Sequence, residues 1–390
     1  MKKYSIIIGL LLVVFVISFN VTIEAQTDQI ELLSQSIKSY HLNNYNEAKE
    51  LNSQINLDEL TTSAKIDTLY YRTLIELALG NVSKGKEHLN ELNKMGYDFG
   101  MIHYELARIY MNTYNNFDSA YYQTALEEFK KARSLGVNSA QFHRDHAMAY
   151  IGLNNREEAV KELELAVSKN GTTSDYMNIA NMYKELDNYS KAEENYRKVL
   201  NLDSNNTNAI SELGDVLIQQ KKYTQATMTL QKGIDINPDS VILNYKLGQA
   251  YYLNKEYDNA EKYLLNVIEL KNNNYSALYY LGKTYEQKEN FQNAKYYLNE
   301  ATKYNPDYAQ AYIALGDINL KQGNNYQAIA NYSTAIEQNP NYPEGHFHLA
   351  LAYYQADMKE AAISELRKTL HLSNNDHSKA QELLDRLQEE

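Results

Sequence analysis

The sequence contains no cysteine among its 390 residues, which excludes several kinds of site. Disulfide bonds, zinc sites with thiolate ligands, thiol nucleophiles and a lipid-carrying N-terminal cysteine are all ruled out. Proline and glycine are also scarce, at 4 and 15 residues. Because all-β folds need many tight turns built from these residues, the composition favours a helical protein.

An excess of positive charge is missing as well. The 38 lysine and arginine residues stand against 50 aspartate and glutamate residues, and the formal net charge is −12. Nucleic-acid binding relies on lysine and arginine contacts to phosphates, and this chain has no basic cluster. Nucleic acid and an anionic membrane surface are therefore unfavourable partners.

The N-terminus has the features of an export signal. Lys2 and Lys3 precede an apolar run over residues 6–19. This run has the length of a signal-peptide core and is shorter than the roughly 20 residues that a membrane-spanning helix needs. We expect residues 1–25 to be a signal peptide that is cleaved after Ala25, leaving the mature protein in the periplasm or cell envelope. The alternative is an uncleaved segment, 6–23, that anchors the chain in the inner membrane.

A 34-residue period runs through most of the chain. Gly214, Gly248, Gly282 and Gly316 are spaced by this period, and each follows a leucine. Six consecutive units contain no insertion or deletion, and they begin at Thr173, Thr207, Val241, Tyr275, Ala309 and Pro343. Self-similarity at this period is typical of solenoid proteins built from stacked repeats.

Each unit has the pattern of two amphipathic helices. In the unit that begins at Tyr275, one apolar stripe runs from Leu278 to Tyr285 and a second from Ala294 to Ala301, both at helical spacing. Neither helix buries its stripe alone, so the units must stack. The sequence therefore predicts an all-α solenoid.

The unit that begins at Ala309 resembles the tetratricopeptide repeat (TPR). That pattern has an aromatic residue, Leu-Gly, a tyrosine, an alanine, a second aromatic residue and a proline. The matching residues here are Tyr312, Leu315, Gly316, Ala328, Tyr332, Ala335 and Pro340, whereas Asn319 stands where tyrosine is usual. The resemblance implies a right-handed superhelical solenoid that binds other proteins and is not an enzyme.

The resemblance weakens towards the N-terminus, which suggests a domain division. We expect degenerate TPR-like repeats over 26–139, a regular array over 140–376 and a C-terminal capping helix over 377–390. Asn375 or Asp376 is expected to cap that last helix. Its inward-facing residues are expected to be Ala380, Leu383, Leu384 and Leu387.

One triplet within the array has a second interpretation. Gly282-Lys283-Thr284 also ends the phosphate-binding loop of nucleotide-hydrolysing enzymes, G-x-x-x-x-G-K-[ST]. Ala277 stands where that loop needs its first glycine, and no β-branched run precedes it. We interpret Gly282 instead as a point where the paired helix approaches closely.

The histidines are the remaining candidates for metal binding or acid–base chemistry. His143 and His146 lie three residues apart, and His346 and His348 lie two apart. A metal site needs a third ligand that converges on them, and the sequence identifies none. We therefore expect structural roles for both pairs, no metal site and no cofactor.

The predicted site is a surface. In proteins of the resembled family, the first helix of each repeat lines a concave groove, through positions 2, 5, 6, 9, 12 and 13. Aromatic side chains there suit a clamp for an extended peptide or a helix. Lys283 is expected to project into the groove, whereas Met177 stands where carboxylate-clamping members have lysine. The predicted peptide-binding residues are Asn178, Asn181, Tyr245, Gln249, Tyr252, Tyr279, Tyr280, Lys283, Asp317, Phe347 and Tyr354.

The sequence thus predicts an exported scaffold or adaptor that binds a protein or peptide partner, or assembles an envelope complex. Two alternatives stay open. One is the recognition arm of an enzyme, or a cryptic enzyme, that acts on glycans or peptides, for which only 26–139 offers room outside the regular array. The other is a membrane-tethered structural spacer.

Overall fold

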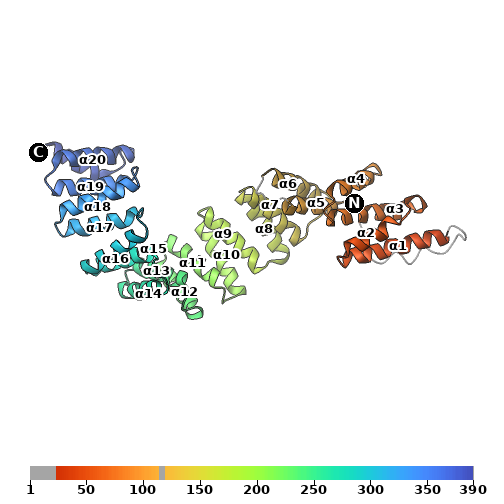
Figure 1. Ribbon diagram of the computed structural model, residues 1–390, viewed down its shortest axis with the longest axis horizontal. Helices are drawn as coiled ribbons and strands as arrows, with labels where there is room; N and C mark the ends of the chain where they lie inside the picture. The colour runs from red at the N-terminus through yellow and green to blue at the C-terminus, as the bar shows by residue number, and fades with distance from the viewer. Residues whose placement is uncertain (1–22, 114–118, 390) are drawn as a thin grey trace. The chain divides into compact units, whose positions relative to one another are not determined.

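The computed structural model describes residues 23–113 and 119–389. Within these ranges the chain forms α-helices, one short 3-10 helix at Leu57–Glu59 and no strand (Figure 1). The first eight helices are α1 (Ile23–His41), α2 (Tyr45–Ser53), α3 (Thr62–Ala78), α4 (Val82–Lys94), α5 (Gly100–Thr113), α6 (Ser119–Ser134), α7 (Ala140–Gly152) and α8 (Arg156–Asn170). The next six are α9 (Thr173–Glu185), α10 (Tyr189–Leu202), α11 (Thr207–Gln219), α12 (Tyr223–Ile236), α13 (Val241–Leu253) and α14 (Tyr257–Leu270). The last seven are α15 (Tyr275–Gln287), α16 (Phe291–Tyr304), α17 (Ala309–Lys321), α18 (Asn325–Gln338), α19 (Pro343–Gln355), α20 (Lys359–Leu372) and α21 (Ser378–Glu389).

The expected signal segment lies almost entirely outside the described residues. Helix α1 begins at Ile23, so the cleavage point expected after Ala25 falls in its first turn. No helix in the described part of the chain is long and apolar enough to cross a membrane.

The chain divides by its contacts into two compact units, Met1–Asp175 and Tyr176–Glu390. Within the series α1 to α4, α5 to α8 and α10 to α21, each helix packs against the next one in the sequence. In the second unit the first helices of successive repeats also touch one another, α11 with α13, α13 with α15, α15 with α17 and α17 with α19. We call these first helices, α9 to α19 in odd numbers, the A helices and their partners the B helices. The all-α solenoid that the sequence predicts is confirmed.

The recurring glycines allow close packing of A on B helices. A Cβ atom added to Gly282 would lie 2.6 Å from Leu298 Cγ, and one added to Gly316 would lie 2.5 Å from Tyr332 Cε1. Side chains do not approach that closely, so the glycine provides room for the residue opposite. The equivalent pairs one and two periods earlier are Gly248 with Leu264 and Gly214 with Leu230.

The turn between the two helices of a repeat holds one residue in the left-handed region. The φ angle is 59° at Lys221, 64° at Lys255, 58° at Glu289 and 59° at Asp357, and Gly323 occupies the same position with 73°. This conformation ends the A helix, and only glycine adopts it without steric cost.

The abundant asparagines serve in part as helix caps. Asn206 and Asn274 accept hydrogen bonds from the backbone N–H groups of Ala209 and Ala277, each at 3.0 Å, and so cap two A helices. Asparagine is among the preferred N-cap residues because its side-chain oxygen pairs with an otherwise unpaired N–H.

The last helix closes the array largely as predicted. Ala380, Leu383, Leu384 and Leu387 are all buried. The predicted cap is wrong, however, because His377 Nδ1 accepts the hydrogen bond from Ala380 N, at 3.1 Å. The residues at 374 and 375 adopt left-handed φ angles of 52° and 64°, and the chain therefore turns before the helix starts at Ser378.

Candidate functional site: the A-helix face of the second unit

All eleven residues of the predicted site lie on A helices, and all are partly buried. Asn178 and Asn181 lie on α9, and Asp317 lies on α17. Five of the others come together where α13 and α15 are adjacent. These are Tyr245, Gln249, Tyr252, Tyr279 and Tyr280.

Tyr280 is the centre of this group. Its ring makes edge-to-face contacts with Tyr245, Tyr252 and Tyr279, with centroids 6.1, 5.5 and 5.3 Å away. Its hydroxyl oxygen lies 2.7 Å from Gln249 Nε2, which donates to it. Perpendicular aromatic pairs at such separations are favourable beyond the area they bury.

Two further tyrosines extend the group, and the sequence analysis did not select them. Tyr308, which precedes α17, packs edge-on against Tyr279 at 5.2 Å and against Tyr275 at 5.3 Å. They were missed because the family's groove positions do not include the residue before an A helix or its first residue. We define the tyrosine cluster as Tyr245, Tyr252, Tyr275, Tyr279, Tyr280 and Tyr308.

The hydroxyl groups of Tyr245, Tyr279 and Tyr308 stay protonated at physiological pH, because burial raises their pKa values. Burial, with the neighbouring tyrosines as a smaller cause, raises the pKa of Tyr308 to about 12. Burial also raises the pKa of Tyr245 and Tyr279. These three tyrosines therefore present uncharged aromatic faces and hydroxyl groups.

The ionic side chains near α11 are paired with one another across helices. Lys246 Nζ of α13 lies 2.6 Å from Asp215 Oδ2 and 3.3 Å from Glu212 Oε1, both on α11. Glu212 also pairs with Lys184 of α9. These lysines and carboxylates tie together three successive A helices.

Lys283 is likewise paired within the protein. Its Nζ lies 2.5 Å from Glu286 Oε2, and Glu286 also binds Lys321 of α17. Burial opposes the charge on Lys283, but the bond to Glu286 outweighs it and raises the pKa of Lys283. The lysine that was expected to project towards a partner thus already has a partner on its own helix.

Asp317 is held by two neighbours. Its Oδ1 accepts a hydrogen bond from the Tyr332 hydroxyl at 2.7 Å and lies 3.0 Å from His348 Nδ1. Burial opposes its ionisation, but these partners outweigh it and lower the pKa of Asp317. Asp317 therefore links α17 to its B helix α18 and to α19.

The two ends of the predicted site are separate from the tyrosine cluster. Asn181 Oδ1 accepts a hydrogen bond from the Tyr196 hydroxyl at 2.6 Å, a contact within one repeat. Phe347 packs on His377 with ring centroids 4.6 Å apart. Arg386 of α21 lies over the Tyr354 ring at 5.0 Å. The last helix thus contributes to the surface at this end.

The alternative chemical sites have structural roles. Thr284 is fully buried in the middle of α15, where its hydroxyl donates to the Tyr280 carbonyl at 2.7 Å, so Gly282-Lys283-Thr284 forms no loop. His143 Nδ1 lies 2.8 Å from Glu162 Oε2, and His346 Nδ1 lies 2.6 Å from Glu365 Oε2. No group of three or more metal-ligating side chains occurs among the described residues.

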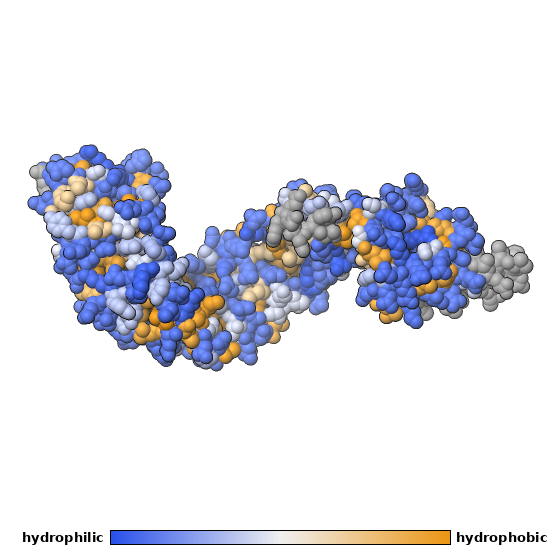
Figure 2. Space-filling model, in the orientation of Figure 1, coloured by the Kyte–Doolittle hydropathy of each residue, from blue (hydrophilic) through white to orange (hydrophobic). Residues whose placement is uncertain are grey.

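The surface as a whole is mostly hydrophilic, with separate apolar patches (Figure 2). One patch lies over α12, α13 and α14. Met228, Ile242 and Leu270, one on each of these helices, are 65%, 61% and 45% exposed. Methionine, isoleucine and leucine side chains are more hydrophobic than those of the tyrosine cluster, because tyrosine has a polar hydroxyl group on its aromatic ring.

Comparisons with known proteins agree with this architecture. Family models described as TPR repeat match residues 214–255 and 316–357. Models described as tetratricopeptide repeat match 176–206 and 242–274, and a further one matches 279–325. Comparison with curated proteins finds no match.

Two solved structures with TM-scores above 0.5 show the same fold. A tetratricopeptide repeat protein from Parabacteroides merdae is 15% identical, with a TM-score of 0.55 over 65% of this chain and 100% of that one. The APC/C hetero-tetramer Cut9-Hcn1 is 14% identical, with a TM-score of 0.51 over 92% of this chain and 76% of that one. A TPR protein from Cytophaga hutchinsonii is 22% identical, with a TM-score of 0.48 over 60% and 96% of the two chains. The matched repeats and the stacked helix pairs agree in showing tetratricopeptide repeats within residues 176–357.

Proposed function

We propose that this protein is an interaction scaffold that binds a segment of another protein on the A-helix face of its second unit, over the tyrosine cluster. The repeat family supports the general role, because such arrays present extended binding surfaces. The single observation that carries the location is the gathering of six tyrosines from α13, α15 and the start of α17.

The nature of this surface also favours one mode of recognition. Tyrosine supplies a large, rigid contact area and a hydroxyl group at a low cost in side-chain entropy, and it is enriched at binding hot spots. The neighbouring charges are already engaged with one another, as in the Lys246–Asp215 and Lys283–Glu286 pairs. The partner segment is therefore held mainly by aromatic packing and hydroxyl hydrogen bonds.

A triple variant tests this location. Tyr252→Ala, Tyr279→Ala and Tyr308→Ala together should weaken partner binding at least about tenfold, or about 1.4 kcal/mol. The matched control replaces three exposed tyrosines of the B helices by alanine. They are Tyr296, Tyr304 and Tyr326, which are 59%, 41% and 73% exposed. Partner capture is measured after cross-linking in envelope extract, and helical circular dichroism verifies folding. Equal losses in the two variants would place the binding surface elsewhere.

We further propose that the scaffold acts outside the cytoplasm. The support is the pair of lysines followed by the apolar run at 6–19. N-terminal sequencing of the mature protein tests this point. A mature chain that begins at Gln26 supports export with cleavage. An uncleaved N-terminus in the membrane fraction supports the tethered alternative. An uncleaved N-terminus in the cytoplasm overturns the proposal.

A further inference from the structure

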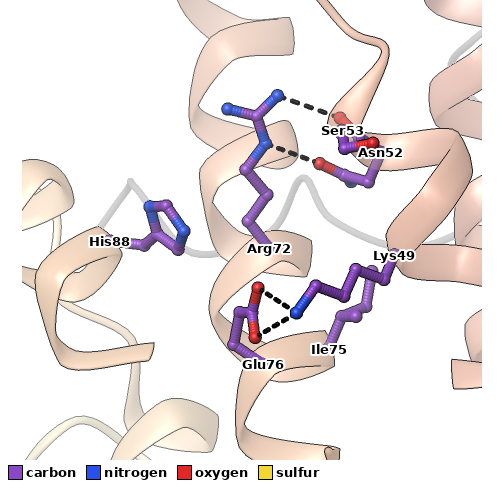
Figure 3. A pocket seen from close by; sticks show the side chains of 7 residues that line it. All are labelled: Lys49, Asn52, Ser53, Arg72, Ile75, Glu76 and His88. Atoms are coloured by element: carbon purple, nitrogen blue, oxygen red, sulfur yellow. Dashed lines mark hydrogen bonds and ion pairs between the residues drawn. The ribbon is translucent and has the colours of Figure 1, made fainter. Parts of the chain in front are cut away.

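A cavity in the first unit has a chemistry that the proposed function does not use. It measures about 240 Å³ and lies between α2, α3 and α4. Figure 3 shows the seven side chains that line it, namely Lys49, Asn52, Ser53, Arg72, Ile75, Glu76 and His88. Six of the seven are polar or charged, so the cavity is built for a polar guest and not for an apolar one.

The one carboxylate in the lining is already neutralised. Lys49 Nζ lies 2.9 Å from Glu76 Oε1 and 3.0 Å from Glu76 Oε2. Asn81 Nδ2 also donates to Oε2, at 2.7 Å. Burial opposes ionisation of Glu76, but these contacts outweigh it and lower its pKa. Both oxygens are therefore engaged, and the Lys49–Glu76 pair adds no net charge to the cavity.

Arg72, in contrast, brings a positive charge that only neutral groups contact. Its Nε donates to Asn52 Oδ1 at 2.8 Å, and its Nη2 donates to the carbonyl oxygens of Asn52 and Ile55, each at 2.9 Å. In the described part of the chain, no carboxylate lies within ion-pair distance of this guanidinium. The exposed Glu91 acts on it only at longer range. The lining therefore holds one positive charge in excess.

A purely structural role accounts for only part of this arrangement. The bonds from Nε and Nη2 close the C-terminal end of α2, where carbonyl groups lack helical partners. They leave Nη1 without a hydrogen-bond partner among the described residues. Figure 3 shows this nitrogen directed to the side on which His88 lies. His88 Nδ1 is buried and has no hydrogen-bond partner in the described chain. Two polar groups thus remain unsatisfied on the same side of the cavity.

We propose that this cavity binds a carboxylate group, which accepts hydrogen bonds from Arg72 Nη1 and His88 Nδ1. One excess positive charge matches a monoanion, and Nη1 is left to donate a charge-assisted hydrogen bond to it. A volume of about 240 Å³ admits a small acid or the end of a chain, and not a folded partner. The carboxylate comes either from a free small acid or from a peptide C-terminus. This site is independent of the tyrosine cluster, since it lies in the other unit.

Calorimetric titration of the full chain distinguishes these sources. The probes are acetate, tri-alanine with a free C-terminus, tri-alanine amide and inorganic phosphate. The site is supported by binding of acetate, or by binding of tri-alanine with the amide at least tenfold weaker than the free peptide. Acetate binding identifies a free acid as a sufficient ligand, and tri-alanine binding alone identifies the peptide terminus. Phosphate that binds as tightly as the best carboxylate, or an amide equal to the acid, would overturn the assignment, as would no binding at all.

Two variants locate the binding. Arg72→Gln removes the charge, and His88→Leu removes the second donor without touching the bonds that close α2. Each should weaken carboxylate binding at least tenfold, whereas Arg197→Gln on α10, an arginine that is 48% exposed, serves as the matched control and should bind like the parent chain. His88→Leu keeps the test valid if Arg72→Gln unfolds. Unchanged affinity in folded His88→Leu rules out this site.

Discussion

His346 and Glu365 form a buried contact between the A and B helices of one repeat, with Nδ1 and Oε2 2.6 Å apart. His143 and Glu162 form the same contact, at the same sequence separation, in a repeat of the first unit. A third pair, His103 and Glu128, occurs at the equivalent place on α5 and α6, with 2.5 Å between Nδ1 and Oε2. A histidine–glutamate bond is thus a recurring way of joining the two helices of a repeat in this chain.

The Glu162 contact predicts loss of stability in acid. Burial opposes its ionisation, but bonds from His146, Arg133 and His143 outweigh it and lower the pKa of Glu162 from 4.5 to about 2. Since the folded chain binds this proton less readily than the unfolded chain, its stabilisation is full above pH 4.5 and disappears as the pH falls towards 2. The loss amounts to about 3 kcal/mol at most. Urea unfolding at a series of pH values measures it.

Glu162→Gln should therefore be less stable than the parent at pH 7 and show a flatter pH dependence below pH 4.5. Burial lowers the pKa of His143, so its protonation adds a loss in the same direction below pH 6.5 in both proteins. Glu157→Gln on the exposed side of α8 is the control and should follow the parent. An equal slope in the parent and Glu162→Gln would show that this contact does not set the acid limit.

Two buried tyrosines at equivalent positions give a second prediction. Tyr332 donates to the carboxylate of Asp317 at 2.7 Å, and Tyr196 donates to the neutral amide of Asn181 at 2.6 Å. A hydrogen bond to a charged group contributes about 1.5–3 kcal/mol, against about 1 kcal/mol for a neutral pair. Tyr332→Phe should thus destabilise the second unit more than Tyr196→Phe does. Chemical denaturation compares the two, and the reverse order contradicts the contacts described here.

The left-handed turns predict a stabilising substitution. Lys255 has a φ angle of 64° and is exposed, whereas the equivalent residue two repeats later is Gly323, with a φ angle of 73°. A non-glycine residue pays about 1 kcal/mol for this conformation. Lys255→Gly should therefore raise the free energy of unfolding by about 0.5–1 kcal/mol. Gly323→Ala is the reverse experiment and should lower it by a similar amount. A drop in melting temperature for Lys255→Gly would contradict the prediction.

The paired charges predict unequal effects of single substitutions. The Glu286 side chain is 2% exposed and faces Lys283 and Lys321, which are 18% and 54% exposed. Removal of Glu286 leaves a partly buried lysine without a partner, so Glu286→Ala should cost about 2–4 kcal/mol. Lys321→Ala removes the exposed member and should cost less than about 1 kcal/mol. A double-mutant cycle with Lys283 measures the coupling, and a coupling near zero would mean that the pair does not stabilise the fold.

Much of the fold could be predicted from the sequence, because the sequence repeats every 34 residues and each repeat forms the same pair of helices. The glycine slots at 214, 248, 282 and 316 and the apolar faces around them predict the helix pairs, since packing distance and periodicity are local properties. The cap of α21 was predicted wrongly, because the two left-handed residues before the helix decide which side chain meets its start, and that side chain is His377.

The candidate site was predictable only in outline. The A-helix positions gave Tyr245, Tyr279 and Tyr280, which the structure brings together. They did not reveal that Lys283 pairs with Glu286 on the same helix, because a spacing of three residues permits an ion pair without requiring one. His143 and Glu162 are as far apart in the sequence as His346 and Glu365. This equal separation was visible in the sequence, and it is the signal that indicates the contact between the two helices.

The pairing of Lys184, Lys246, Lys283 and Lys321 with carboxylates of their own chain bears on how a partner would be selected. Charges that neutralise each other at short range produce little field at a distance, so they do not steer a diffusing molecule. Encounter with the tyrosine cluster should then depend weakly on ionic strength. Partners should therefore be distinguished by the dissociation rates of their complexes and not by their association rates.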